Sequence, residues 1–271
     1  NFSQDHLDYH KTFDAYFAAK AALFTRVLPE DGVAVVNMDD RFAPDWLANL
    51  TNRRVLRVSF KDVSADCFAQ DIQTSANSLE FAINLQGQAM QVSLNAQGEH
   101  NVRNALMAAA CASAVGADLQ KIKQGLANFA PVAGRMSRHI GINGVALIDD
   151  SYNANPGSVR AAIDVLAQKK HSVLVLGDLG ELGAEAPQLH AELGEYARTK
   201  KLSHLFTVGT LSENAATAFG AGAEHFKDKA ALVEHLKTIA NKKTTILIKG
   251  SRSAAMDTVV RELCVSAGDK H

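Results

Sequence analysis

The sequence predicts an α/β protein whose second half is a doubly wound parallel sheet. After residue 137, short apolar segments of strand length alternate with amphipathic segments of helix length to the end of the chain. Such alternation is typical of right-handed βαβ units, which build mostly parallel sheets. The 271 residues are 47% hydrophobic. This composition suffices for packed cores, and the length suggests about two domains.

The first half is predicted to contain helices and strands in a less regular order. Apolar residues at spacings of three and four predict the first helix, which Pro29 and the following polar residues end. The Gln86-Gly87 pair between two alternating segments predicts a hairpin. The helices expected here cover residues 12–28, 102–115 and 118–129. The strands expected here cover residues 33–37, 55–60, 78–85 and 89–94.

The pattern of predicted helices and strands changes at residues 131–136. This change predicts the boundary between two domains, residues 1–136 and residues 137–271. The strands expected in the second domain cover residues 145–149, 172–176, 204–208, 224–226 and 244–249. The helices expected between them cover residues 157–168, 187–200, 213–219, 230–240 and 254–264.

Composition and charge exclude several classes of protein. The net charge of −1 argues against nucleic-acid binding, because surfaces that bind nucleic acids carry an excess of basic residues. No apolar run reaches the roughly 18 residues that a membrane span requires. Three widely spaced cysteines cannot form a disulfide framework and fit a reducing compartment. We therefore expect a cytoplasmic protein that neither spans a membrane nor binds nucleic acid.

Unusual polar motifs follow the predicted strands of the second domain. They cover residues 149–157, 177–183, 209–210 and 249–253. Ligands of open α/β sheets bind beyond the carboxyl ends of the strands. The four motifs together would line one edge of the sheet, which predicts a binding site there.

Each motif also has an ordinary structural interpretation. Asp150 follows Asp149, and two adjacent carboxylates repel unless one finds a partner such as a sugar hydroxyl or a cation, which favours function. Asn155 precedes Pro156, so a helix N-cap is favoured on the residues alone. Asp178 and Glu181 suit a solvated acidic loop and a binding role equally well.

The segment 249–253 combines Lys249, Arg252, two hydroxyls and a helix start. A helix N-terminus attracts anions, and Arg252 could bind a carboxylate in a bidentate way. The alternative is a capped helix whose cations extend into solvent. We favour the anion site.

Four candidate residues lie in the first half. Lys20 falls on the apolar stripe of its predicted helix, so it must extend to solvent, pair with a carboxylate or be chemically modified; extension to solvent is the usual outcome. His6 alone is a weak metal signal. Asn101 and Asn104 share a helix face and could contact a heterocycle, but on the residues alone a cap at Asn101 and a surface position for Asn104 are favoured.

Taken in order, the segments DDSYNANPGS (149–158), GDLGELG (177–183) and KGSRSAAM (249–256) resemble the Mur ligase family. These enzymes are ATP-dependent amide-forming ligases of peptidoglycan precursor synthesis. The resemblance implies that residues 1–136 are the C-terminal portion of an incomplete central ATP-binding domain. It also implies that residues 137–271 are a Rossmann-like ligase domain.

The motifs are most similar to the family member that adds D-alanyl-D-alanine to UDP-N-acetylmuramoyl-tripeptide. The resemblance implies ATP and Mg²⁺ as cofactors and an acyl-phosphate intermediate. It also implies closure of the two domains about a hinge near residues 131–137. Phosphoryl transfer of this kind depends on positioning and on neutralisation of charge.

The resemblance also implies roles for individual residues. It implies catalytic roles for Lys20, Arg135 and Asp150. The Mg²⁺ ligands it implies are His6 and a carbamylated Lys20, which would offer the oxygen that Mg²⁺ prefers. The nucleotide-binding residues it implies are Asn101, Asn104, Arg135 and Asp150. The substrate-binding residues it implies are Asn155, Lys249, Ser251 and Arg252.

Two features depart from the pattern of the family. No G-x-x-x-x-G-K-[ST] phosphate loop occurs in the sequence. Because the chain also opens without methionine in a polar segment, we expect it to be a piece of a longer protein. The missing upstream part would carry the phosphate loop and the UDP-binding domain, so this chain alone should be inactive. The segment DHLDYH (5–10) looks more like the ligase that adds the third amino acid.

Two other functions stay open. One is the tripeptide-forming ligase, which adds diaminopimelate or lysine; the D-N-P-R motif of the diaminopimelate-adding enzyme is absent from the C-terminal half. The other is a non-catalytic module that binds nucleotide or peptide.

Overall fold

A computed structural model describes residues 2, 6–75, 78–96, 98–130 and 132–264. Among these residues, residue 2 and residues 12–130 form one compact unit, and residues 6–11 and 132–264 form another. The expected domain limits of 1–136 and 137–271 stay a prediction. Asp5 and Pro131, which belong to segments singled out in the sequence, lie outside the described residues.

The first unit contains a five-stranded sheet in the order β1-β2-β3-β4-β5. Its strands are β1 (Val33–Asn37), β2 (Arg54–Ser59), β3 (Cys67–Thr74), β4 (Leu79–Leu85) and β5 (Gln88–Leu94). Strands β1 to β3 are parallel, and β3 to β5 are antiparallel. The predicted hairpin is confirmed, since Gln86 and Gly87 both have the positive φ angles that a tight hairpin turn requires.

Strand β3 was not predicted from the sequence. Its pairing with β4 shifts register between Gln70 and Gln73, and Asp71 has a φ of 53°. The irregularity breaks the alternation of buried and exposed residues by which a strand is recognised in a sequence.

Helices precede, connect and follow the strands of this sheet along the chain. They are α2 (Phe13–Ala22), the π-helical turn Leu23–Val27, α3 (Ala43–Ala48), α4 (Glu99–Ala114) and α5 (Leu119–Ala127). The Thr12 hydroxyl caps α2 by accepting a hydrogen bond from the Ala15 amide. Helix α4 begins at Glu99 after Gly98, so the expectation that Asn101 caps this helix is wrong. Gly98 has a φ of 86°, a conformation that glycine adopts readily.

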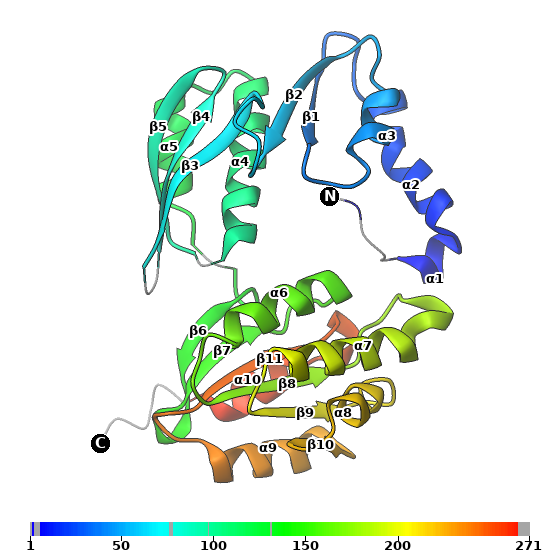
Figure 1. Ribbon diagram of the computed structural model, residues 1–271, viewed down its shortest axis with the longest axis vertical. Helices are drawn as coiled ribbons and strands as arrows, with labels where there is room; N and C mark the ends of the chain where they lie inside the picture. Colours follow the sequence, from blue (N-terminus) through cyan, green and yellow to red (C-terminus); the bar gives the residue numbers. More distant parts are fainter. Residues whose placement is uncertain (1, 3–5, 76–77, 97, 131, 265–271) are drawn as a thin grey trace. The chain divides into compact units, whose positions relative to one another are not determined.

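The second unit contains a six-stranded sheet in the order β10-β9-β8-β11-β7-β6. Its strands are β6 (Ser137–Ile140), β7 (Ala146–Asp150), β8 (Ser172–Gly177), β9 (His204–Val208), β10 (Ala223–Phe226) and β11 (Thr245–Lys249). All neighbours are parallel except β6 and β7. The last strand, β11, lies between β7 and β8 (Figure 1). The predicted doubly wound parallel sheet is confirmed.

Helices cover both faces of this sheet. The helices of the unit are α1 (Leu7–His10), α6 (Pro156–Leu166), α7 (Ala186–Thr199), α8 (Glu213–Phe219), α9 (Lys229–Ile239) and α10 (Asp257–Leu263). Leu174 and Leu176 of β8 pack with α6, α7 and α8. Val173 and Val175 point to the other face and pack with α9 and α10. This alternation places each strand between two apolar layers.

Helix α10 begins later than the predicted start at residue 254. A 3₁₀ turn covers Arg252–Ala254, and Ala255 has a φ of 46°, which interrupts the helix. The interruption brings Met256 back over the ends of β8 and β11. A Cβ atom at Gly177 or Gly250 would lie 2.6 or 2.7 Å from the buried Met256 side chain, so these strand ends must be glycine for the methionine to fit.

No helix within the described residues combines the length and the apolar character needed to cross a lipid bilayer.

Candidate functional site

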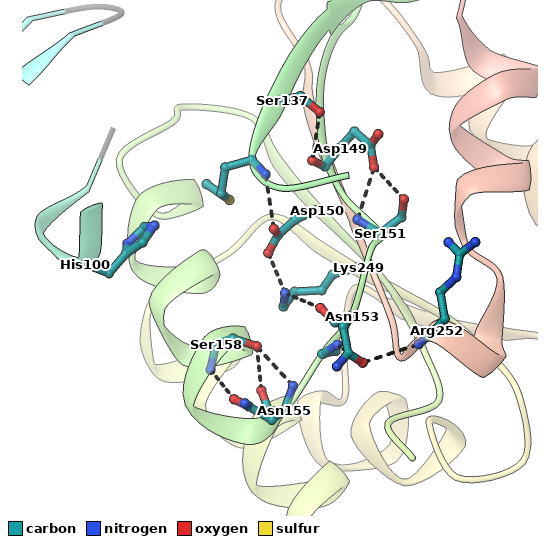
Figure 2. A network of polar contacts seen from close by, with 12 residues as sticks. His100, Ser137, Asp149, Asp150, Ser151, Asn153, Asn155, Ser158, Lys249 and Arg252 are labelled. Carbon is teal, nitrogen blue, oxygen red and sulfur yellow. Dashed lines mark hydrogen bonds and ion pairs between the residues drawn. The ribbon is translucent and has the colours of Figure 1, made fainter. Parts of the chain in front are cut away.

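The predicted motifs of the second unit meet at the carboxyl ends of its strands. Lys249, the last residue of β11, pairs in register with Asp150 of β7 and with Leu176 of β8. The loops that follow these strands therefore begin at the same level of the sheet. Figure 2 shows the polar contacts that join two of them, those after β7 and β11.

A buried ion pair connects β11 to β7. The Lys249 side chain is 2% exposed, and its Nζ donates hydrogen bonds to Asp150 Oδ2 at 2.5 Å and to the Asn153 carbonyl at 3.0 Å. The other carboxylate oxygen, Oδ1, accepts a hydrogen bond from the Met136 amide at 3.1 Å. The partner that Asp150 was expected to need is therefore supplied by a lysine of the same sheet.

Burial disfavours the charged form of Lys249, and the carboxylate of Asp150 favours it. Burial lowers the pKa of Lys249, the charge of Asp150 acts in the opposite direction, and the nearby Arg135 guanidinium lowers the pKa further. A buried ammonium of this kind depends on its carboxylate partner.

The neighbouring Asp149 has a different environment. Its Oδ1 accepts hydrogen bonds from the Ser151 hydroxyl at 2.6 Å and from the Ser151 amide at 3.1 Å. The two adjacent carboxylates thus have separate partners, which relieves their repulsion.

Asp178 joins the loops after β8, β9 and β11. Its Oδ1 accepts hydrogen bonds from the Leu211 and Ser212 amides, at 3.0 and 2.8 Å, in the turn before α8. Its carbonyl accepts hydrogen bonds from the Ser251 amide at 2.9 Å and from the Ser251 hydroxyl at 2.6 Å. Gly209 has a φ of 118°, and a Cβ there would lie 2.4 Å from Asp178 Oδ1. Asp178 therefore connects three loops and has a structural role. The sequence had suggested either a solvated acidic loop or a binding role, and neither describes this connection.

Ser251 is buried, and its hydroxyl donates to Asp178 within the protein. Its contact with a substrate stays a prediction. The exposed Ser253 hydroxyl lies 3.0 Å from the Ser251 hydroxyl.

The helix-cap interpretation of Asn155 is confirmed. Its Oδ1 accepts a hydrogen bond from the Ser158 amide at 2.8 Å, and the Ser158 hydroxyl accepts one from the Asn155 amide at 3.0 Å. This reciprocal pair is a capping box, with Pro156 at the start of α6 (Figure 2). A role of Asn155 in substrate binding remains a prediction.

His190, which the sequence motifs did not indicate, fixes the loop after β8. Its Nε2 accepts a hydrogen bond from the Leu179 amide at 3.0 Å, and its Nδ1 lies 2.6 Å from the Ala186 carbonyl. The ring must therefore be neutral, with its proton on Nδ1. Burial lowers the pKa of His190. A sequence signal existed, because His190 falls on the apolar stripe of α7 with Ala186, Leu193 and Ala197.

We expect His190 to make the stability of the protein depend on pH. Its folded-state pKa is lowered, so the unfolded chain binds a proton first as pH falls below about 6.5. Its contribution is complete above that pH and falls by up to about 1.4 kcal/mol per pH unit below it. Urea unfolding of the parent and of His190→Gln between pH 5 and 7.5 measures this. The variant should lose stability less steeply below pH 6.5; equal slopes would contradict the assignment.

An exposed aromatic ring lies beside two of the predicted site residues. The guanidinium carbons of Arg135 and Arg252 lie 4.4 and 5.9 Å from the centre of the Tyr152 ring. Both arginines are exposed, and Tyr152 is 43% exposed.

In the first unit, Lys20 is exposed and lies on the wall of a cavity of about 340 Å³. Its Nζ lies 5.2 Å from the centre of the Tyr16 ring. Extension of the lysine to solvent is therefore confirmed. Asn37 and Asp40 line the same cavity. Their side-chain oxygen atoms are of the kind that Mg²⁺ prefers, and binding of this ion beside Lys20 stays a prediction.

The two predicted adenine-contacting residues differ in exposure. Asn101 is half-buried, and its Nδ2 lies 3.1 Å from His100 Nε2. Asn104 is exposed, as the surface interpretation expected.

The other predicted metal ligand, His6, belongs to the second unit. Its Nδ1 contacts Glu181 Oε2, and Asp8 Oδ1 accepts a hydrogen bond from the Gly183 amide at 3.2 Å. Within the part of the chain that the structure describes, no three His, Cys, Asp or Glu side chains converge as metal ligands. A magnesium site formed by His6 and Lys20 stays a prediction.

Both halves of the chain match domains of one known protein family. Residues 1–112 match the family described as "Mur ligase middle domain", and residues 134–252 match the one described as "Mur ligase, glutamate ligase domain". The chain belongs to the Mur ligase family. The expectation of Mur ligase domains with α/β sheets, drawn from the sequence, is confirmed.

Individual Mur ligases resemble this chain over most of its length. The UDP-N-acetylmuramoyl-tripeptide–D-alanyl-D-alanine ligase of Escherichia coli K12 is 40% identical over 97% of the chain, and that of Haemophilus influenzae is 34% identical over 97%. A crystal structure of MurF from Acinetobacter baumannii matches 97% of the chain, with a TM-score of 0.86 and 32% identity. The chain spans 58% of the length of each of these three proteins.

The same relatives also test the expectation for the N-terminal segment. The two relatives align with 97% of the chain, and both are named as D-alanyl-D-alanine ligases. The expected likeness of residues 5–10 to the tripeptide-forming Mur ligase therefore finds no support in these comparisons.

Proposed function

We propose that this chain is part of an ATP-dependent ligase that joins D-alanyl-D-alanine to UDP-N-acetylmuramoyl-tripeptide. One observation carries the proposal. The motifs after β7, β8 and β11 are held together at one edge of the sheet by the Asp150–Lys249 and Asp178–Ser251 contacts. They occur in a chain that is 40% identical to the Escherichia coli ligase of that name.

The proposed reaction has two steps. A carboxylate oxygen of the tripeptide attacks the γ-phosphorus of ATP, the bond to the bridging oxygen breaks, and ADP leaves. The amine nitrogen of the dipeptide then attacks the acyl carbonyl, the carbon–oxygen bond to the phosphoryl group breaks, and phosphate leaves as the nitrogen loses a proton. Positioning and charge neutralisation are the main contributions of the protein to such steps.

The residues of this chain would serve these steps in three groups. Asn101 and Asn104 would contact the adenine. Arg135 and Asp150 would contact the ATP phosphates and the ribose. Lys249, Ser251, Arg252 and Asn155 would lie toward the incoming dipeptide.

Mg²⁺ is the metal ion of the proposed ligase. Lys20, as a carbamate, and His6 would hold Mg²⁺, which would neutralise phosphate charge when bound. The oxygen-bearing residues of the Lys20 cavity support this part of the proposal.

The test compares amino-group substrates in the protein that includes the upstream segment. Phosphate release is measured with UDP-N-acetylmuramoyl-tripeptide and D-alanyl-D-alanine. In parallel, the UDP-dipeptide precursor is supplied with diaminopimelate or lysine. We expect turnover only in the first reaction. Turnover only with diaminopimelate or lysine would instead identify the tripeptide-forming ligase.

A second candidate, a non-catalytic binding module, is favoured by one observation. The 271 residues contain no G-x-x-x-x-G-K-[ST] phosphate loop. We expect the purified chain alone neither to hydrolyse ATP nor to form the amide, and measurable turnover would contradict this. An intact phosphate loop upstream would indicate an enzyme, and a degenerate one would indicate a binding module.

A further inference from the structure

Two segments that each carry an arginine are hydrogen-bonded to the chain at or next to Tyr152. On one side, the Tyr152 amide donates a hydrogen bond to the Gly134 carbonyl at 2.9 Å, next to Arg135. A Cβ at Gly134, which has a φ of 75°, would lie 3.0 Å from the Tyr152 amide nitrogen. On the other side, the Arg252 amide lies 3.4 Å from Asn153 Oδ1, the residue after the tyrosine. The backbone thus brings both arginines to one ring.

Each guanidinium lies within the distance at which an aromatic face attracts a cation. The ring attracts both groups but neutralises neither. Among the residues that the structure describes, no carboxylate forms an ion pair with Arg135 or Arg252. The nearby carboxylate of Asp150 is already engaged by Lys249.

A second ring in the same unit provides an internal comparison. Tyr196 of α7 also lies close to two cations, with Arg160 at 5.0 Å and Lys200 at 5.1 Å from its ring centre. Both of those cations have carboxylate partners. Arg160 pairs with Glu192 at 3.2 Å, and Lys200 pairs with Asp164 at 2.6 Å.

The two rings therefore differ in one respect that bears on function. The cations around Tyr196 are satisfied within the protein, as expected of a stabilising surface cluster. The arginines around Tyr152 project their charge from the edge of the sheet where the predicted substrate motifs meet. Two guanidinium groups fixed on one ring present several N–H donors with the planar geometry that oxyanions accept.

We infer that Tyr152 is a positioning residue that orients the Arg135 and Arg252 guanidinium groups for binding of an oxyanion. The oxyanion is a phosphate group or a terminal carboxylate. Whether this oxyanion belongs to the nucleotide or to the dipeptide rests on the proposed function. The existence of the binding site does not rest on it. Without the ring, each arginine loses a contact that limits its side-chain motion and binds with a larger loss of entropy.

The test measures binding of two probes to the 271-residue chain by calorimetric titration. Inorganic tripolyphosphate represents the nucleotide phosphates, and D-alanyl-D-alanine represents the carboxylate. Tyr152→Leu should raise the dissociation constant of at least one probe about fivefold. Tyr152→Phe keeps the aromatic face and should bind as the parent does. Tyr196→Leu is the matched control and should also bind as the parent does.

A double-mutant cycle separates positioning from general damage to the fold. Arg252→Gln should weaken binding in the parent, but it should add little in the Tyr152→Leu background, because the arginine is no longer held there. An effect on tripolyphosphate identifies a phosphate site, and an effect on the dipeptide identifies a carboxylate site.

The inference is overturned if neither probe binds the parent chain. It is also overturned if Tyr152→Leu binds both probes normally, or if Tyr196→Leu weakens binding equally. Absence of ligase activity in the longer protein would reject the proposed function and leave these binding results unchanged.

Discussion

Replacing Lys249 by methionine is expected to lower the free energy of unfolding by about 3–5 kcal/mol. Methionine fills most of the space of the lysine but leaves the Asp150 carboxylate, 13% exposed, without its cation. It also removes the donor to the Asn153 carbonyl. Loss of one partner of a buried pair is costly because the remaining charge stays desolvated. Urea unfolding of the 271-residue chain at pH 7 measures the change.

Two further variants separate the ion pair from the packing of the side chain. The double variant Lys249→Met/Asp150→Asn removes both charges while keeping an acceptor for the Met136 amide, so it should recover most of the lost stability. Lys237→Met breaks the exposed contact between Lys237 and Glu234, whose atoms are 2.7 Å apart, and should leave the unfolding midpoint near that of the parent. If the double variant is as unstable as Lys249→Met alone, the loss comes from packing rather than from the unpaired charge.

Lys20→Ala is expected to lower the turnover of the longer protein by about a hundredfold or more. The structure places Lys20 on the wall of a cavity, exposed and accessible to modification as a carbamate. Short carboxylic acids should restore part of the activity, because they can supply the missing oxygen ligand. Phosphate release with and without added formate, acetate or propionate measures this.

Arg26→Ala is the control for the Lys20 experiment. Arg26 is exposed in the turn that follows the same helix and does not line the cavity. This variant should keep its turnover and show no response to carboxylic acids. Parental activity in Lys20→Ala would remove the carbamate from the proposal.

The sequence predicted most elements of the second unit because buried parallel strands and amphipathic helices leave clear periodic patterns. The exposed four-residue strand β6 was missed, since Ser137–Ile140 has no apolar alternation. The late start of α10 was missed because it depends on contacts of Met256 with Gly177 and Gly250, which are distant in sequence.

The site was predicted as a set of loops but not as a set of contacts. Asp150 was correctly expected to need a partner, and the strand-end position of Lys249 placed it nearby. Their pairing across 99 positions depends on β11 lying between β7 and β8, an order that local patterns do not encode. His190 was overlooked because a histidine on an apolar stripe shows its hydrogen bonds only once the Leu179 amide is placed beside it.

The connection through Asp178 constrains how this edge of the sheet can evolve. Three loops share one aspartate, so a change that shifts any of them alters the other two. The loop after β7 is held by a different interaction, the ion pair between Asp150 and Lys249 of β11. Insertions or substitutions that change ligand preference should therefore accumulate in the parts of the loops that make neither contact. Asp178 and Lys249, together with their partners, can change only in combination.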